Sequence, residues 1–168
     1  KSESMINQIK SYPLLLSSMN FWPPTLVSAF SFSIFGIFFV GAPFVAAKVY
    51  GLSPSQIGML LALMPIGFVP GNIIVGKLVN RFSTRLLLIF GSILLIVGPS
   101  LSFLTSNLYG HQLAFFVPMI IMAFGTGMIW PVANTAIIQA VPSLAGSASG
   151  ISSALMVTTS AISSGVLG

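Results

Sequence analysis

Long stretches without a charged residue dominate this chain, and a single basic segment interrupts them. Between Lys48 and Lys77, and from Arg85 to the end at Gly168, the sequence contains no Asp, Glu, Lys or Arg. A helix needs about 20 apolar residues to cross a bilayer, and both stretches are longer. A soluble domain carries about a quarter charged residues, whereas only 4% of this chain is charged. We therefore predict an all-α membrane protein, a polytopic helix bundle whose solvent is lipid.

The basic segment is GKLVNRFSTR, residues 76–85, and it indicates the orientation of the chain. With the N-terminus on the cytoplasmic side, one side of the membrane carries all cations except Lys48. The cations on that side are Lys1, Lys10, Lys77, Arg81 and Arg85. Because cytoplasmic loops are enriched in Lys and Arg, the N-terminus is predicted to be cytoplasmic. Six cations over the whole chain are too sparse for a nucleic-acid surface.

The inventory of reactive side chains argues against an enzyme. Cysteine is absent, His111 is the only histidine and Glu3 the only acid. No nucleophile–base pair and no cluster of metal ligands can be assembled, so neither a catalytic residue, a metal nor a cofactor is predicted. The glycine-rich GSASG at 146–150 lacks the lysine of a phosphate-binding loop.

The two ends of the chain suggest a piece of a longer polypeptide, because it opens with Lys1 and stops inside an apolar run. Residues 1–20 are polar and are interpreted as a cytoplasmic juxtamembrane linker, and residues 21–168 as the membrane unit. A signal peptide ending near Ala47 is the competing interpretation. We reject it because its apolar region would be far longer than the usual 7–15 residues and further spans follow.

About five transmembrane helices are predicted within the membrane unit, at residues 25–46, 54–76, 86–104, 113–138 and 145–168. Ser53, with Pro54 next and Gln56 three residues on, is a typical helix start. Gly67 and Gly71 form a GxxxG pair that allows close helix contact. On the last span, small residues recur every fourth position and predict a packing stripe. The stripe consists of Gly146, Gly150, Ala154 and Thr158.

The basic segment resembles the loop signature of the major facilitator superfamily, which lies between the second and third helices of each half. Gly76, Arg81 and Arg85 match the signature, whereas Asn80 stands where the family has an acid. A degenerate copy is typical of the second half, and Asn80 weakens any charge-relay latch to a neutral hydrogen bond. Arg81 and Arg85 are expected to bond the last carbonyls of the preceding helix.

Two further stretches resemble the Bcr/CflA-type (bicyclomycin/chloramphenicol resistance) drug:proton antiporters. They are residues 39–58, FVGAPFVAAKVYGLSPSQIG, and 141–153, VPSLAGSASGISS. The resemblance covers residues 19–168 and corresponds to helices seven to eleven of twelve, a partial C-terminal half. It implies alternating access and export of small amphipathic drugs against inward proton flow, in a bacterial inner membrane.

Aromatic and methionine side chains on the expected spans form the candidate wall of a substrate cavity, because such surfaces adapt to many ligands. The candidates are Phe32, Phe35, Phe39, Met64, Met122, Trp130, Asn134 and Met156. The alternative for each Phe and Met is contact with lipid or a neighbouring helix. Trp130 and Asn134 are four residues apart and share a face, and a mid-span amide needs a polar partner, water or another helix.

Proton coupling is not provided by this chain. No acid or base lies inside an expected span, and His111 falls in an outer turn as an interfacial residue. The resemblance implies that the coupling carboxylate belongs to the missing N-terminal half, so the fragment alone is expected to be inactive. Two alternatives stay open: a sugar or metabolite exporter of the same superfamily, and a non-transporting membrane scaffold.

Overall fold

A computed structural model describes residue 13 and residues 15–165, and all regular structure there is helical, as the sequence predicts. Lys1, Glu3, Lys10 and most of the expected linker lie outside the described residues. In chain order the helices are α2 (Trp22–Lys48), α3 (Pro54–Leu61), α4 (Met64–Leu78), α5 (Thr84–Tyr109), α6 (Gln112–Phe116), α7 (Met119–Ala140), the short 3-10 turn η1 (Pro142–Leu144) and α8 (Ala145–Gly165).

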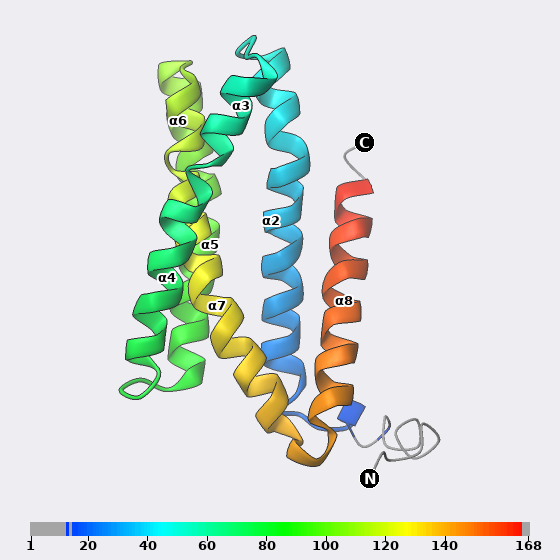
Figure 1. The fold of residues 1–168 in the computed structure, drawn as a ribbon. Helices are drawn as coiled ribbons and strands as arrows, with labels where there is room; N and C mark the ends of the chain where they lie inside the picture. Colours follow the sequence, from blue (N-terminus) through cyan, green and yellow to red (C-terminus); the bar gives the residue numbers. More distant parts are fainter. Residues whose placement is uncertain (1–12, 14, 166–168) are drawn as a thin grey trace.

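Four segments of the described chain are long and apolar enough to cross a membrane, where the sequence predicts about five. They are Trp22–Lys48, Pro54–Leu78, Thr84–Tyr109 and Gln112–Ala140. The helix at the fifth position, α8, has 21 residues and runs alongside α2 (Figure 1). Its many serines and threonines lower its mean hydropathy, so α8 does not qualify by composition.

Prolines divide two of the four segments. The second breaks between α3 and α4 just before Pro65, and the fourth breaks between α6 and α7 at Pro118. Proline has no N–H to donate, and its ring conflicts with the carbonyl four residues earlier, so a helix tends to break there. Pro70 and Pro131 lie inside α4 and α7 without ending them.

The start of α3 forms the expected capping box. The Gln56 N–H donates to Ser53 Oγ at 3.5 Å, and the Ser53 N–H donates to Gln56 Oε1 at 2.9 Å. Ser83 starts α5 in a related way, because its Oγ accepts a hydrogen bond from the Leu86 N–H at 3.4 Å.

Helix α7 is the centre of the bundle. It packs most extensively against α4 and α5, and it slants so that its C-terminal end reaches the base of α2 and α8 (Figure 1). The buried core follows α7, where Met122, Met128 and Ile129 are almost fully inaccessible. The bundle therefore has two parts, the group α4–α7–α5 and the pair α2–α8.

Glycines determine how closely the helices of the group α4–α7–α5 approach one another. A Cβ atom at Gly67 would collide with the Ile120 carbonyl, and one at Gly71 with the Phe124 carbonyl, both on α7. Gly127 of α7 meets the Phe68 carbonyl of α4 in the same way. The GxxxG pair thus brings the backbones of α4 and α7 into direct contact, as expected.

The small-residue stripe of α8 is not used within the described bundle. A Cβ atom added at Gly146 or Gly150 would have no neighbouring atom within 4 Å, and Ala154 and Thr158 are exposed. Helix α8 instead buries Ala148 and Ser152, since that face is the one turned toward its neighbours. The spacing of the small residues thus defines one face of α8, and that face points away from the rest of the described bundle.

Candidate substrate-facing site

An aromatic cluster centred on Trp130 joins three helices. The Trp130 ring lies 5.5 Å from Phe32 and 6.1 Å from Phe35, both on α2. On its other side it lies 5.4 Å from Phe68 of α4, in an edge-to-face arrangement. These centroid distances are in the range in which aromatic pairs attract one another. We call these four rings the Trp130 cluster.

The indole N–H of Trp130 has no hydrogen-bond partner among the described residues, although its nitrogen is buried. A buried donor without a partner costs about 1–3 kcal/mol. The indole N–H is therefore an unsatisfied donor within the described residues.

Two amides lie one helical turn beyond the Trp130 cluster. Asn134 follows Trp130 by four residues on α7, and Asn72 follows Phe68 by four residues on α4. Both side chains are exposed and make no hydrogen bond to another described residue. The surface next to the aromatic rings therefore carries two polar groups, and Asn134 has no partner on another described helix.

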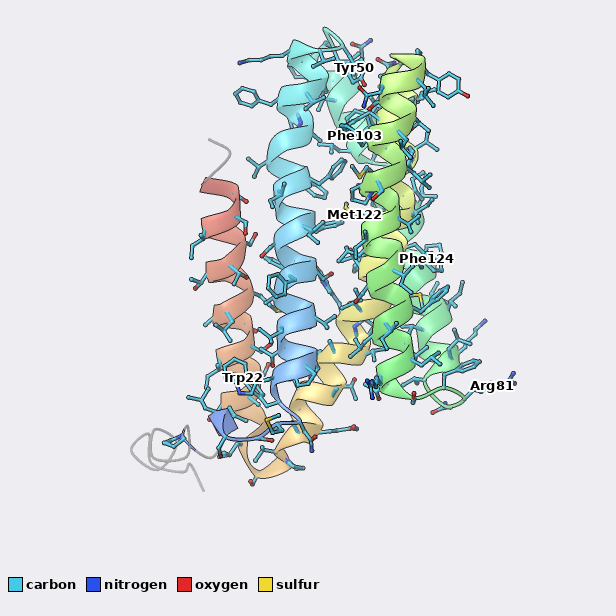
Figure 2. All side chains as sticks on the ribbon, turned by 180° about the vertical axis from the view of Figure 1, so that it is seen from behind. Trp22, Tyr50, Arg81, Phe103, Met122 and Phe124 are labelled. Atoms are coloured by element: carbon cyan, nitrogen blue, oxygen red, sulfur yellow. The ribbon has the colours of Figure 1, made fainter. Side chains whose placement is uncertain are left out.

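The other predicted wall residues lie in different places. Phe39 lies next to the Trp130 cluster, with its ring centre 4.8 Å from that of Phe35. Met156 on α8 is half-buried. Met64 and Met122 are buried, with 1% and 0% of their surfaces exposed. Met122 packs against Gly98 of α5, where α5 and α7 overlap (Figure 2). These two methionines fill helix interfaces and do not line an open wall.

Sequence reasoning missed Phe68, which completes the Trp130 cluster. A signal for it exists: α4 and α7 both carry an aromatic residue four positions before an asparagine, Phe68–Asn72 and Trp130–Asn134. The glycines at 67 and 71 turn α4 toward α7, and this contact brings Phe68 next to Trp130.

The basic segment forms an exposed turn at one end of the bundle, and we call this end the basic end. Gly76, Asn80, Arg81 and Arg85 are all exposed. Arg81 projects away from the helices at the end opposite to Tyr50 (Figure 2). The Leu78 carbonyl is bonded at 2.9 Å by the Arg81 backbone N–H. The expected side-chain bonds from Arg81 and Arg85 to helix-end carbonyls do not form within the described residues.

The opposite loop holds the remaining cation of the described chain. Lys48 Nζ lies 4.7 Å from the centre of the Phe44 ring, in a cation–π contact. Both residues line a shallow hollow of about 430 Å³ that also includes Pro54 and Ile57. Lys48 and the basic segment therefore lie at opposite ends of the bundle.

Potential metal ligands are sparse among the described residues. These residues contain no group of three or more His, Cys, Asp or Glu side chains that could hold a metal ion. His111 starts α6, where its Nδ1 accepts a hydrogen bond from the Leu113 N–H at 3.1 Å. His111 therefore lies in the turn between α5 and α6, and the side of the membrane on which this turn lies stays a prediction.

Four apolar membrane-length segments with a half-buried aromatic cluster between them define an integral, polytopic α-helical membrane protein. The sequence matches the family model of the Major Facilitator Superfamily over residues 2–165. The chain belongs to the Major Facilitator Superfamily, a family of membrane transporters. Searches of curated proteins and of solved structures each returned no match.

Proposed function

We propose that this chain contributes the substrate-binding surface of a drug:proton antiporter of the bicyclomycin/chloramphenicol resistance type in a bacterial inner membrane. The Trp130 cluster is the observation that supports the proposal best. The cluster is formed by rings from α2, α4 and α7. Relative movement of these helices would therefore change the contacts of a ligand bound to it. The resemblance of residues 39–58 and 141–153 to these antiporters supports the same function.

The ligand chemistry follows from the groups present. Ring faces of Phe32, Phe35 and Phe68 favour a flat, apolar body. The free indole N–H of Trp130 and the exposed amide of Asn134 favour an oxygen acceptor on that body. The proposed substrate is therefore a small amphipathic molecule with an aromatic or alicyclic core and a carbonyl-type or hydroxyl oxygen.

The proposed wall keeps most of the residues expected from the sequence. It consists of Phe32, Phe35, Phe39, Phe68, Trp130, Asn134 and Met156. Met64 and Met122 support it from behind, because both are buried between helices.

Proton coupling is proposed to use a carboxylate outside this chain. The only acid of the sequence is Glu3, and the membrane-length segments hold no Asp or Glu. A proton path through the membrane core needs a group that titrates there. The chain reconstituted alone should therefore bind drug but give no pH-dependent drug flux.

Tryptophan fluorescence tests substrate binding directly. The chain has two tryptophans, so Trp22→Phe leaves Trp130 as the only indole. Titrating the purified variant with an amphipathic aromatic antibiotic should quench Trp130 emission saturably. Phe68→Ala should weaken binding up to about tenfold, because one aromatic pair contributes about 0.5–1.5 kcal/mol.

Phe103→Ala is the matched control, since Phe103 is 70% exposed on α5 and lies outside the cluster (Figure 2). Equal weakening by both substitutions, or no saturable quenching at all, would remove the Trp130 cluster as the binding surface. Saturable quenching by a sugar and not by the antibiotic would favour a sugar exporter.

Drug accumulation in cells tests the transport step. Cells that express the complete transporter should accumulate less of a fluorescent amphipathic drug than control cells, and a proton uncoupler should abolish the difference. If the drug binds but the uncoupler does not abolish its efflux, the proposed binding site would stand and proton antiport would be rejected.

A further inference from the structure

A groove lined by residues of α2, α5 and α7 lies away from the Trp130 cluster. It has a volume of about 890 Å³ and lies between α5, the start of α2 and the end of α7. In Figure 2, α5 and α2 stand in front, and the lower part of α7 passes behind and between them. Its lining includes Val27 of α2, Ala136 of α7, and Leu88, Ile89 and Ile93 of α5.

Polar groups of the groove gather at the basic end. Asn20, Thr84, Arg85 and Gln139 line the groove there, and each is exposed. Asn20 precedes α2, Thr84 and Arg85 start α5, and Gln139 lies in the last turn of α7, so the fold brings them together. The described residues include no Asp or Glu, and Arg85 therefore has no carboxylate partner among them. Within the part of the chain that the structure describes, the charge at this end of the groove is positive and uncompensated.

Beyond Arg85 the groove becomes apolar. Ile89, Ile93 and Ile96 are successive exposed positions along one side of α5, each at least half exposed. Ser92 adds little polarity, because its Oγ–H donates to the Leu88 carbonyl at 2.8 Å. The charged group and the apolar wall thus occupy opposite ends of one groove.

The length of the apolar part matches half a bilayer. From Arg85 to Ile96 the axis of α5 advances by about 16 Å, at about 1.5 Å per residue. One leaflet of hydrocarbon is about 15 Å thick, since the whole core is about 30 Å. A molecule held by its head at Arg85 would have its apolar tail within a single leaflet.

We propose that this groove binds an anionic phospholipid. The Arg85 guanidinium pairs with the phosphate, the amides of Asn20 and Gln139 bond its oxygens, and one acyl chain lies along Ile89, Ile93 and Ile96. Basic pockets between membrane helices are known to hold such headgroups. Charge complementarity favours this occupant over a further protein helix, because an apolar helix offers nothing to Arg85.

Native mass spectrometry of the full chain in detergent tests the proposal with phosphatidylglycerol and phosphatidylcholine. The chain should retain one phosphatidylglycerol at concentrations where phosphatidylcholine is lost. Arg85→Gln should reduce the bound fraction at least fivefold. Arg81→Gln is the matched control, because it removes the same charge from the same turn but does not line the groove, and it should leave the bound fraction nearly unchanged.

A second variant distinguishes lipid binding within the groove from simple electrostatic attraction to the protein surface. Ile93→Trp fills the apolar part without changing any charge, and it should also lower phosphatidylglycerol retention. A photoactivatable phosphatidylglycerol should label peptides of α5 and the start of α2, and excess glycerol phosphate should not compete. Equal loss in the two arginine variants, competition by glycerol phosphate, or labelling elsewhere would overturn the proposal. Crosslinking of the groove to a protein segment would overturn it in favour of a further helix.

Discussion

The group α4–α7–α5 and the pair α2–α8 are held together by different chemistry. In the first, glycines place backbone against backbone: Gly127 meets the Phe68 carbonyl, and Gly125 meets the Gly91 carbonyl. In the second, a Cβ atom at Gly36 of α2 would meet only side-chain atoms of α8, and it would collide only with the Ser160 hydroxyl. A backbone atom cannot move aside, whereas a serine side chain can rotate. The first interface should therefore be intolerant of change and the second adaptable.

The hydroxyl groups of α2 and α8 show a further difference between the pair α2–α8 and the group α4–α7–α5. Ser28 and Ser31 of α2 and Ser152 of α8 are buried with no hydrogen-bond partner among the described residues. The one described hydrogen bond between the two helices runs from the Thr159 hydroxyl to the Ala29 carbonyl at 3.5 Å. The described part of the interface between α2 and α8 thus has one long hydrogen bond, and both helices bury hydroxyls that make none. Such an interface can rearrange, which suits a transporter whose helices must move.

The largest predicted effect is at Gly127. Gly127→Ala places a methyl group against the Phe68 carbonyl of α4, and overpacking of this kind costs about 1–3 kcal/mol. Thermal unfolding of the detergent-solubilised chain should shift to a clearly lower temperature. Gly76→Ala is the control, because a Cβ at Gly76 would have no neighbour within 4 Å. An unchanged midpoint for Gly127→Ala would mean that α4 and α7 are not in backbone contact.

A smaller effect is predicted at Gly36. Gly36→Ala pushes only the Ser160 hydroxyl, and the gain in helix propensity of about 0.5–1 kcal/mol offsets that cost. The unfolding midpoint should change little, and Gly36→Ala combined with Ser160→Ala should be at least as stable as the unmodified chain. Gly41→Ala on the same helix meets no neighbour and provides the reference. A loss as large as that of Gly127→Ala would abolish the distinction between the two interfaces.

The smallest effects are predicted for the hydroxyls of α2. Ser31→Ala removes a buried, unpartnered hydroxyl and should be neutral or slightly stabilising. Thr25→Val removes a hydroxyl that donates to the Phe21 carbonyl at 2.7 Å and should cost about 0.5–1.5 kcal/mol. Unfolding in mixed micelles compares the two variants. The reverse order would show that Ser31 has a partner outside the described residues.

Several elements could be predicted from local chemistry. The capping box at Ser53 and the membrane-length segments follow from side-chain types at fixed spacing, and the structure has both. The breaks before Pro65 and at Pro118 were not predicted, because prolines inside membrane helices are often tolerated and the local sequence does not show which ones interrupt a helix.

The candidate site depended on more than local chemistry. The contact between Phe68 and Trp130 requires the rotation of α4, and tertiary glycine contacts set that rotation. The burial of Met122 could not be predicted for the same reason, because it depends on how α5 packs against α7. The stripe on α8 shows the converse: a regular pattern identifies a face but not its partner.

The arrangement of the bundle in the membrane is tested most directly by cysteine labelling, since the chain has no cysteine of its own. Phe82→Cys lies at the basic end and Val49→Cys in the opposite loop, and both side chains are exposed. With a membrane-impermeant maleimide, position 49 should be labelled in intact cells, and position 82 only after the membrane is opened. Labelling of position 82 in intact cells would contradict a cytoplasmic basic end, and with it the orientation proposed for the transporter.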